Sequence, residues 1–380
     1  MKDLSESRIL IVDDTRANID ILVEALRNDY KLSVAVDGSA ALRSVEKNPP
    51  DLVLLDIMMP DVDGYEVCRR LRARDATREL PVMFLSALED VKNKAQGFEV
   101  GGNDYLTKPF EVLEVKARVR SLLKAKAYAD AVREAMNRDL RIAREIQMGI
   151  LPADLAGLTK GTGIEVDAVI EPVREVGGDL YEVLRVSDRV VVALGDVSGK
   201  GIPAALFMAV AVTVLRTLAR QIAEPDEILR RLNDDLAETN PRGMFVTLQC
   251  LVFDLKQKRL SCAGAGHHQL AIVSPGHPPR LACPSTGRPA GLWPSNPIER
   301  ESLALEAGDT FVLFSDGVSE ATNTEEAFYG EERLLAVLAA CAGATPKDIV
   351  TRVLADVRGF AAGARQSDDI TVLAVRYGGR

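Results

Sequence analysis

The sequence predicts an α/β doubly wound domain over residues 1–120, a helical linker over 121–150 and an α+β domain over 151–380. The second domain is expected to have a β-sandwich core flanked by helices. Three observations predict this: alternating apolar runs and amphipathic segments, then a heptad repeat, then a return to strand-like runs. A chain of 380 residues can bury two separate cores.

Short apolar runs mark the strands of the first domain. They are ILIV (9–12), LSVAV (32–36), DLVLLD (51–56), LPVMFLS (80–86) and DYLTKPF (104–110). Their alternation with amphipathic segments indicates a parallel sheet with helices on both faces. Ligands of such sheets bind at the carboxyl edge, so the site is expected there.

A seven-residue repeat marks the linker, and no Gly or Pro occurs from 111 to 147. One set of seam positions is Leu122, Ala129, Met136, Ala143 and Ile150, and the other is Ala125, Val132, Asp139 and Ile146. This pattern predicts a coiled-coil stalk and hence a parallel homodimer. The alternative is a single helix that packs its apolar stripe on a neighbouring domain.

The strand-like runs of the second domain are longer and lie on both sides of two helix candidates. They are EVDAVIEP, RVVVALGDV, MFVTLQCLVFDL, LSCAGAG, QLAIV, DTFVLFSDG and DITVLAVRY. This texture indicates strands in the core with helices outside.

Composition narrows the class of protein. A net charge of -9 argues against nucleic acid as a partner. Five cysteines without a CxxC pair are interpreted as packed thiols in a reducing compartment. The N-terminus lacks a signal-peptide core, and the apolar run at 204–215 is shorter than the roughly 20 residues of a membrane span. We therefore expect a cytoplasmic protein without a membrane partner.

Polar residues end the strands of the first domain: Asp13 and Asp14, Asp56, Ser86 and Lys108. Three convergent carboxylates need a cation, and oxygen ligands favour Mg²⁺. Asp56 could then attack a phosphoryl group, which Ser86 and Lys108 would hold.

Four motifs of this segment, VDD (12–14), LLDIMMPDVDG (54–64), LSA (85–87) and YLTKPF (105–110), resemble the receiver domain of two-component response regulators. The resemblance implies phosphorylation of Asp56 by a sensor histidine kinase. It implies a Mg²⁺ site of Asp13, Asp14, Asp56 and the Met58 carbonyl, with Ser86 and Tyr105 as a switch pair. It also implies a cis bond before Pro109.

Aspartates recur beside glycine or at strand ends in the second domain. They are Asp179, Asp196, Asp316 and the adjacent pair Asp368 and Asp369. Separated carboxylates without a Cys or His set could bind two Mg²⁺ or Mn²⁺ ions, which would activate water for phosphoryl displacement. Each aspartate alone also fits a turn or cap.

The motifs VGGDLYEV (176–183), GDVSGKG (195–201), FSDGVSEA (314–321) and SDDITVLAV (367–375) resemble PPM-type (protein phosphatase 2C-like) serine/threonine phosphatases. The likeness is greatest to the bacterial branch of sporulation and stress-response partner switching, and AREIQMGILP (143–152) resembles its lead-in. The resemblance implies that Asp196 bridges both metals, that the Val197 carbonyl and Asp179 are ligands, and that Asp316 and Asp368 complete the first metal site. Asp369 is a ligand or a supporting residue.

Three further residues lie in or near these motifs. Glu182 stands where the branch usually has Asp. His267 is interpreted as a structural histidine, with proton donation as the alternative. Lys200 ends a motif that does not match a phosphate loop and is interpreted as a solvated loop cation.

The sequence therefore predicts a response regulator whose output is a metal-dependent protein phosphatase under the control of Asp56. The resemblance implies a phosphorylated anti-sigma-factor antagonist as substrate. One alternative is a catalytically weak module that sequesters a partner. A diguanylate cyclase, suggested by the GGD triplet, is disfavoured because Leu180 and Tyr181 follow it.

Overall fold

The computed structural model describes residues 3–87, 97–238, 240 and 242–379. Its contacts divide the chain into two compact units, Met1–Arg138 and Asp139–Arg380. The two units are described one at a time.

The first unit is a five-stranded parallel sheet in the order β2-β1-β3-β4-β5. Its strands are β1 (Arg8–Val12), β2 (Lys31–Ala35), β3 (Leu52–Asp56), β4 (Val82–Ala87) and β5 (Asp104–Lys108), preceded by the short η1 (Leu4–Glu6). The helices α1 (Arg16–Leu26), α2 (Gly38–Lys47) and α3 (Gly64–Arg72) connect them. The five predicted apolar runs therefore all form strands.

Along each strand, successive side chains point to opposite faces of this sheet. Leu10 and Val12 belong to one buried cluster with residues of α2 and α3. Ile9 and Ile11 belong to the other, with residues of α1. The sheet is therefore covered on both faces, as its unbroken apolar strands require.

Helix α5 (Val112–Ile150) is 39 residues long and contributes to both units. At its start, Val115, Val119 and Leu123 repeat every four residues and are buried against the first unit. Arg118 pairs with Asp104 of β5 at 2.8 Å. The helix predicted for the linker is present and begins well before residue 121.

Two antiparallel sheets of five strands form the second unit. One has the order β13-β10-β9-β8-β7 and the other β12-β11-β14-β15-β6. The strands are β6 (Ile164–Glu171), β7 (Leu180–Val186), β8 (Arg189–Val197), β9 (Val246–Asp254), β10 (Arg259–Ala265), β11 (Leu270–Val273), β12 (Arg280–Ala282), β13 (Arg300–Ala304), β14 (Thr310–Phe314) and β15 (Ile370–Tyr377). All seven predicted runs form strands, while β7, β12 and β13 lie outside them.

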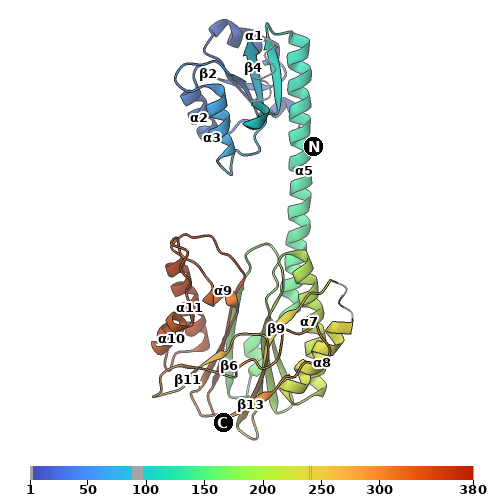
Figure 1. Ribbon diagram of the computed structural model, residues 1–380, viewed down its shortest axis with the longest axis vertical. Coiled ribbons are helices and arrows are strands. Elements are labelled where there is room, and N and C mark those ends of the chain that lie inside the picture. Colours follow the sequence, from blue (N-terminus) through green and yellow to red (C-terminus); the bar gives the residue numbers. More distant parts are fainter. Residues whose placement is uncertain (1–2, 88–96, 239, 241, 380) are drawn as a thin grey trace. The chain divides into compact units, whose positions relative to one another are not determined.

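The sheets pack face to face with helices outside. Along β15, Leu373 and Val375 point into the core between the sheets, whereas Val372 and Ala374 join a cluster beneath α10 (Glu331–Ala339) and α11 (Pro346–Ala361). Helices α7 (Ile202–Gln221) and α8 (Pro225–Glu238) cover the other sheet (Figure 1). The short helices α6 (Leu155–Thr159) and α9 (Asp316–Ser319) complete the unit.

Among the described residues, α7 is long and apolar enough to cross a membrane by length and composition. It extends beyond the predicted run at 204–215, so the expectation that this segment is too short is wrong. Its buried face, which includes Met208 and Leu215, packs against the sheet of β7 and β8, whereas Leu206 and Val210 of the same helix are exposed.

Two cysteines form a disulfide, Cys262 of β10 with Cys283, which follows β12 of the opposite sheet. The expectation of packed thiols is therefore wrong for this pair, because the packing of the two sheets brings together residues 21 positions apart. Cys68, Cys250 and Cys341 are buried free thiols, as expected.

Candidate functional sites

The first candidate site lies at the carboxyl edge of the parallel sheet. Asp13 follows β1, Asp56 ends β3 and Lys108 ends β5. The Lys108 ammonium lies 2.8 Å from Asp13 and 2.9 Å from Asp56. Asp14 joins them, since oxygens of the three carboxylates lie within 4.8 Å of one another.

Burial sets the electrostatics of this site. Asp13 and Asp56 are almost fully buried, while Asp14 is exposed. Burial raises the pKa of Asp56, and the bond from Lys108 opposes that rise. Burial also lowers the pKa of Lys108, but its bonds to both carboxylates outweigh this and leave its pKa raised. Two buried carboxylates that share one ammonium fit a divalent cation.

The remaining predicted receiver residues lie on β4, on β5 and directly after β3. Ser86 lies in β4 beside β5, and its side chain is buried. The Tyr105 ring packs 5.4 Å from Phe84, and burial raises the pKa of its hydroxyl. The backbone N–H of Met58 bonds to Asp56. The bond between Lys108 and Pro109 is cis, as the resemblance implies.

The second candidate site gathers carboxylates from four segments of the second unit. Asp179 precedes β7 and Asp196 lies in β8. Asp316 begins α9, and the pair Asp368 and Asp369 precedes β15. Besides burial, the charge of Asp196 raises the pKa of Asp179, and the charges of Asp316 and Asp368 raise the pKa of Asp196. The charge of Asp368 also raises the pKa of Asp316, so all four predicted segments meet.

A glycine allows two of these segments to approach. A β-carbon on Gly178 would lie 2.7 Å from the carbonyl oxygen of Val197 and 3.2 Å from a carboxylate oxygen of Asp196. The loop before β7 can therefore carry Asp179 against Asp196 only with a residue that lacks a side chain. The same contact places the Val197 carbonyl at the predicted site.

Asp369 has a different environment from the other four aspartates. Its two oxygens accept hydrogen bonds from the backbone N–H groups of Val173 and Gly178, at 2.7 and 2.8 Å. It thereby fixes the loop that carries Asp179. This arrangement favours the alternative left open for Asp369, a residue that supports the ligands.

The carboxylates fit a cation because their charge is poorly compensated. Oδ1 of the buried Asp179 has no hydrogen-bond partner among the described residues, and Thr371 donates to its Oδ2. Burial, followed by the charge of Asp196, raises the pKa of Asp179 strongly. Burial and then the charge of Asp316 raise the pKa of Asp196 to about 7. An unsatisfied oxygen inside a carboxylate cluster is expected where a metal binds.

The second site is wider than the first. Within the described part of the chain, three acidic, cysteine or histidine ligands lie within 4.8 Å of one another at Asp13, Asp14 and Asp56, and at Cys262, Cys283 and Glu301. The latter group contains the disulfide. The carboxylates of the second unit are more widely spread, as a pair of ions would require.

His267 is enclosed beside this site. Its Nε2 lies 3.2 Å from the Phe314 carbonyl, which can only accept, so Nε2 carries the proton. Its Nδ1 therefore accepts from the Thr247 hydroxyl at 2.8 Å. Burial lowers the pKa of His267 to about 3. Both ring nitrogens are engaged, which favours the structural role.

Hydrogen bonds that the sequence does not indicate connect the end of α5 to the loop before Asp179. Gln147 donates to the Gly177 carbonyl at 2.7 Å and accepts from the Gly177 N–H at 3.3 Å. Gln147 belongs to the motif AREIQMGILP, but nothing in that motif indicates its hydrogen-bond partner, which lies 30 residues away.

Glu182 and Arg216 form the other such contact. Arg216 of α7 bonds to the buried Glu182 at 2.7 Å and to the carbonyl of Ile150, the last residue of α5, at 2.8 Å. Burial raises the pKa of Glu182, and Arg216 opposes the rise. Glu182 therefore anchors a structural ion pair.

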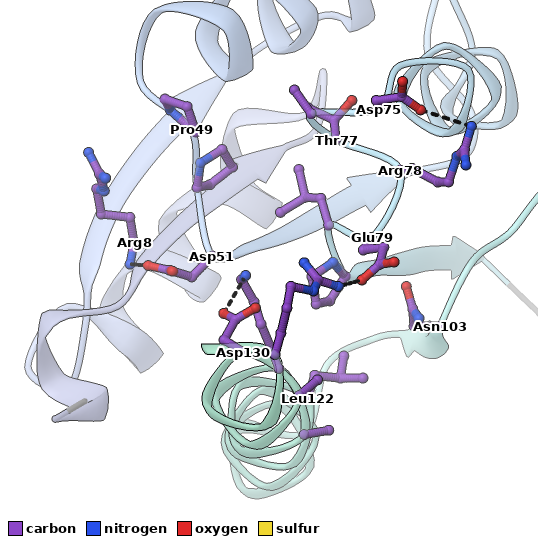
Figure 2. A pocket seen from close by; sticks show the side chains of 18 residues that line it. Arg8, Pro49, Asp51, Asp75, Thr77, Arg78, Glu79, Asn103, Leu122 and Asp130 are labelled. Carbon is purple, nitrogen blue, oxygen red and sulfur yellow. Dashed lines mark hydrogen bonds and ion pairs between the residues drawn. The ribbon is translucent and has the colours of Figure 1, made fainter. Parts of the chain in front are cut away.

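A cavity of about 580 Å³ in the first unit contains none of the predicted site residues. Figure 2 shows Leu122 and Asp130 of α5 along one side of it, with Arg8 and Pro49 opposite. Its charged residues pair with one another: Lys126 with Asp130 at 2.9 Å, Arg78 with Asp75 at 3.0 Å, and Arg133 with Glu79. Such internal pairing does not identify a charged ligand.

The doubly wound unit and the double-sheet unit, each with its carboxylate cluster, define a receiver domain fused to a PP2C-type phosphatase domain. Residues 9–120 match the response regulator receiver domain family, and residues 187–378, just over half of the chain, match the Stage II sporulation protein E (SpoIIE) family. The chain belongs to the SpoIIE family.

Two curated relatives match different extents of the chain. Response regulator PleD of Caulobacter vibrioides is 40% identical over 153 residues, which are 40% of this chain and 32% of that protein. Protein IcfG of Synechocystis is 26% identical over 96% of this chain and 58% of its own length. The chain thus spans about a third to three fifths of these relatives.

The SiaA-PP2C domain of Pseudomonas aeruginosa is similar in structure. Its TM-score is 0.59 at 23% identity, and the match covers 65% of this chain and 99% of that domain. At this identity the likeness shows a common fold.

Proposed function

We propose that the chain is a metal-dependent protein phosphatase that removes phosphate from serine or threonine of a partner protein. The observation that carries this proposal is the buried, undercompensated carboxylate cluster around Asp179 and Asp196. Asp179, Asp196, Asp316, Asp368 and the Val197 carbonyl would hold two Mn²⁺ or Mg²⁺ ions. When bound, the ions lower the pKa of the attacking water and offset charge on the phosphoryl oxygens.

The chain's own residues supply the order of this site. Asp369 and Gly178 hold the Asp179 loop, and Thr371 orients the Asp179 carboxylate. The guanidinium of Arg174 lies 3.7 Å from the position that a β-carbon on Gly201 would occupy, beside the loop that follows Asp196. Arg174 is exposed, so its guanidinium could donate hydrogen bonds to the phosphate of a substrate. Water adds to phosphorus, the bond to the serine oxygen breaks, and a proton given up by the attacking water ends on that oxygen, which leaves as the serine hydroxyl.

The receiver would control this reaction. A sensor histidine kinase would donate its phosphoryl group to Asp56, with Mg²⁺ held by Asp13, Asp14, Asp56 and the Met58 carbonyl. Ser86 and Lys108 would bind the phosphoryl oxygens, and Tyr105 would move with Ser86. The Gln147 bonds to Gly177 support α5 as the element through which the change reaches the Asp179 loop.

The partners belong to the same proposal. The SpoIIE family supports a phosphorylated anti-sigma-factor antagonist as substrate, in the cytoplasm. The exposed seam residues Val132, Met136 and Ile146 support a homodimer through α5.

Phosphatase assays on a phosphoserine protein test this function. The full chain is expected to release phosphate in Mn²⁺ but not in EDTA, and Asp316→Ala should abolish release. A beryllofluoride adduct on Asp56 should change the rate, and Asp56→Ala should remove that change. Binding of the phosphoprotein without Mn²⁺-dependent release would indicate a sequestering module instead. An Asp56→Ala rate equal to the wild-type rate, with and without beryllofluoride, would refute receiver control.

A further inference from the structure

Lys200 of the GDVSGKG segment is exposed, and its ammonium is also paired with a carboxylate of the second candidate site. Its Nζ lies 2.7 Å from Oδ2 of Asp368 and donates to the carbonyl of Ser367. The side chains of Lys200 and Asp368 are 37% and 35% exposed, so solvent reaches the pair. The chain thus places its own cation on a proposed metal ligand.

Both oxygens of Asp368 are occupied in this arrangement. Oδ2 accepts from Lys200, and Oδ1 accepts from the backbone N–H of Asp369 at 2.9 Å. The Asp369 bond is fixed by the chain, whereas Lys200 reaches the site through a flexible side chain. A metal ion that binds Oδ2 of Asp368 would lie close to the Lys200 ammonium, and repulsion between the two cations favours release of the ammonium.

The backbone around Lys200 is held on both sides, so its side chain can move alone. Ser198 donates its N–H to the Phe245 carbonyl at 2.8 Å and accepts from the Phe245 N–H at 2.9 Å. Gly201, with φ 76°, caps α7. Release of Lys200 from Asp368 requires only rotation about side-chain bonds.

We propose that Lys200 is a tethered cation that occupies Asp368 in the metal-free protein and leaves it when a metal binds, so that it sets the metal affinity of the site. This proposal rests on the proposed function, because it requires a metal at Asp368. The ammonium compensates the charge of Asp368. Its displacement weakens metal binding by the strength of the ion pair.

Lysine labelling of the full chain gives a readout that is independent of catalysis. Acetylation followed by mass spectrometry should show Lys200 up to about fivefold more reactive in Mn²⁺ than in EDTA, because a partly exposed ion pair favours the bound form by that factor at most. Lys256 is a matched control, since it pairs with Asp188 at the same distance of 2.7 Å in another part of the domain. Its labelling should not change with Mn²⁺.

Mn²⁺ titration by calorimetry gives the second readout. Lys200→Met should lower the Kd by about two- to fivefold, and Lys200→Arg should keep it near the wild-type value. Arg365→Met removes the same charge two residues from Ser367 and should leave the Kd within about twofold of the wild type.

Each outcome decides the proposal. It is overturned if Lys200 labelling stays constant when Mn²⁺ binds, if Lys200→Met leaves the Kd unchanged, or if Arg365→Met lowers the Kd equally. A wild-type chain that binds no Mn²⁺ refutes this proposal and the metal-dependent function together. Bound Mn²⁺ with unchanged Lys200 labelling refutes this proposal alone.

Discussion

Two buried ionisable residues of the phosphatase unit, His267 and Asp179, differ in how far the surrounding structure satisfies their polar atoms. His267 satisfies both ring nitrogens and remains neutral, because burial lowers its pKa to about 3. Within the described part of the chain Asp179 leaves one oxygen without a hydrogen bond, and burial raises its pKa strongly. His267 therefore stabilises the fold, whereas Asp179 keeps an oxygen available for a metal ion and lowers the stability of the fold.

His267 predicts a specific loss of stability in acid. Its folded pKa lies below its unfolded pKa of about 6.5, so its contribution is present above that value and is lost as the pH falls toward 3. From pH 7 to pH 5 the free energy of unfolding should fall by about 2 kcal/mol through this residue alone. Urea unfolding in EDTA, followed by the fluorescence of Trp293, the single tryptophan, measures it.

A pair of neighbouring variants isolates that contribution. His267→Asn should be less stable at pH 7 but should lose about 2 kcal/mol less than the wild type between pH 7 and pH 5. His268→Asn should keep the wild-type dependence, because His268 is partly exposed. An unchanged pH dependence in His267→Asn would contradict the assignment.

Asp179 predicts a gain in stability at the expense of metal binding. In EDTA at pH 8, Asp179→Asn should raise the free energy of unfolding by about 1–3 kcal/mol, because an amide can donate to Asp196 where a carboxylate repels it. The same variant should lose the stabilisation that Mn²⁺ gives the wild type. Trp293 fluorescence again reports the transition.

Asp167→Asn is the control for this effect. Asp167 lies on β6, and its pKa is raised mainly by burial, with the nearby charge of Lys347 opposing the rise. That variant should keep the stabilisation by Mn²⁺. Equal metal stabilisation of wild type and Asp179→Asn would remove Asp179 from the metal site.

The aspartates could be predicted from the sequence because each stands where an apolar run begins or ends, and strand ends meet at sheet edges. Their supporting contacts could not. Gly178 and Asp369 are 191 residues apart, and Lys200 lies 168 positions before Asp368. Such pairs depend on how two sheets pack, which no local pattern encodes. The disulfide between Cys262 and Cys283 was missed for the same reason.

At the scale of elements, helix α5 contributes residues to both units. Its first turns are buried with the receiver through Val115 and Val119. At its other end Gln147 bonds to Gly177, and Arg216 bonds to the Ile150 carbonyl. The sequence predicted the helix from its lack of Gly and Pro, but its role at the phosphatase site depends on these contacts.

Gln147→Ala should remove the control of the phosphatase rate by the receiver. Without the two bonds to Gly177, the Asp179 loop no longer responds to α5. The rates of phosphate release with and without beryllofluoride on Asp56 should therefore be nearly equal. Loss of these bonds changes the stability of the loop by about 1–2 kcal/mol, enough to alter the rate by about five- to thirtyfold. Phosphate release in Mn²⁺, with and without beryllofluoride, measures the effect.

Glu145→Ala tests whether any change in the helix has the same result. Glu145 is exposed on the same turn of α5 and should leave the response to beryllofluoride intact. If Gln147→Ala keeps the wild-type response, the signal reaches the site by another route.

At the scale of the whole molecule, the heptad pattern predicts a dimer. Seam residues Val132, Met136 and Ile146 are 51%, 59% and 64% exposed, although each is apolar. Leu122, Ala125 and Ala129 of the same seam line the cavity of Figure 2. An apolar seam on a helix of 39 residues favours pairing with the same helix of a second chain.

Charges in the seam should therefore dissociate the dimer. Val132→Asp combined with Met136→Asp places four carboxylates in a two-stranded interface, which should shift the mass measured by light scattering from that of a dimer to that of a monomer of 41.2 kDa. Ala131→Asp with Asn137→Asp adds as much negative charge at exposed positions outside the seam and should leave the dimer intact. A wild-type chain that is monomeric at micromolar concentration, or a control pair that dissociates equally, would refute the seam. If the seam variant is monomeric but still responds to beryllofluoride, each chain transmits its signal through its own α5, and pairing serves another purpose.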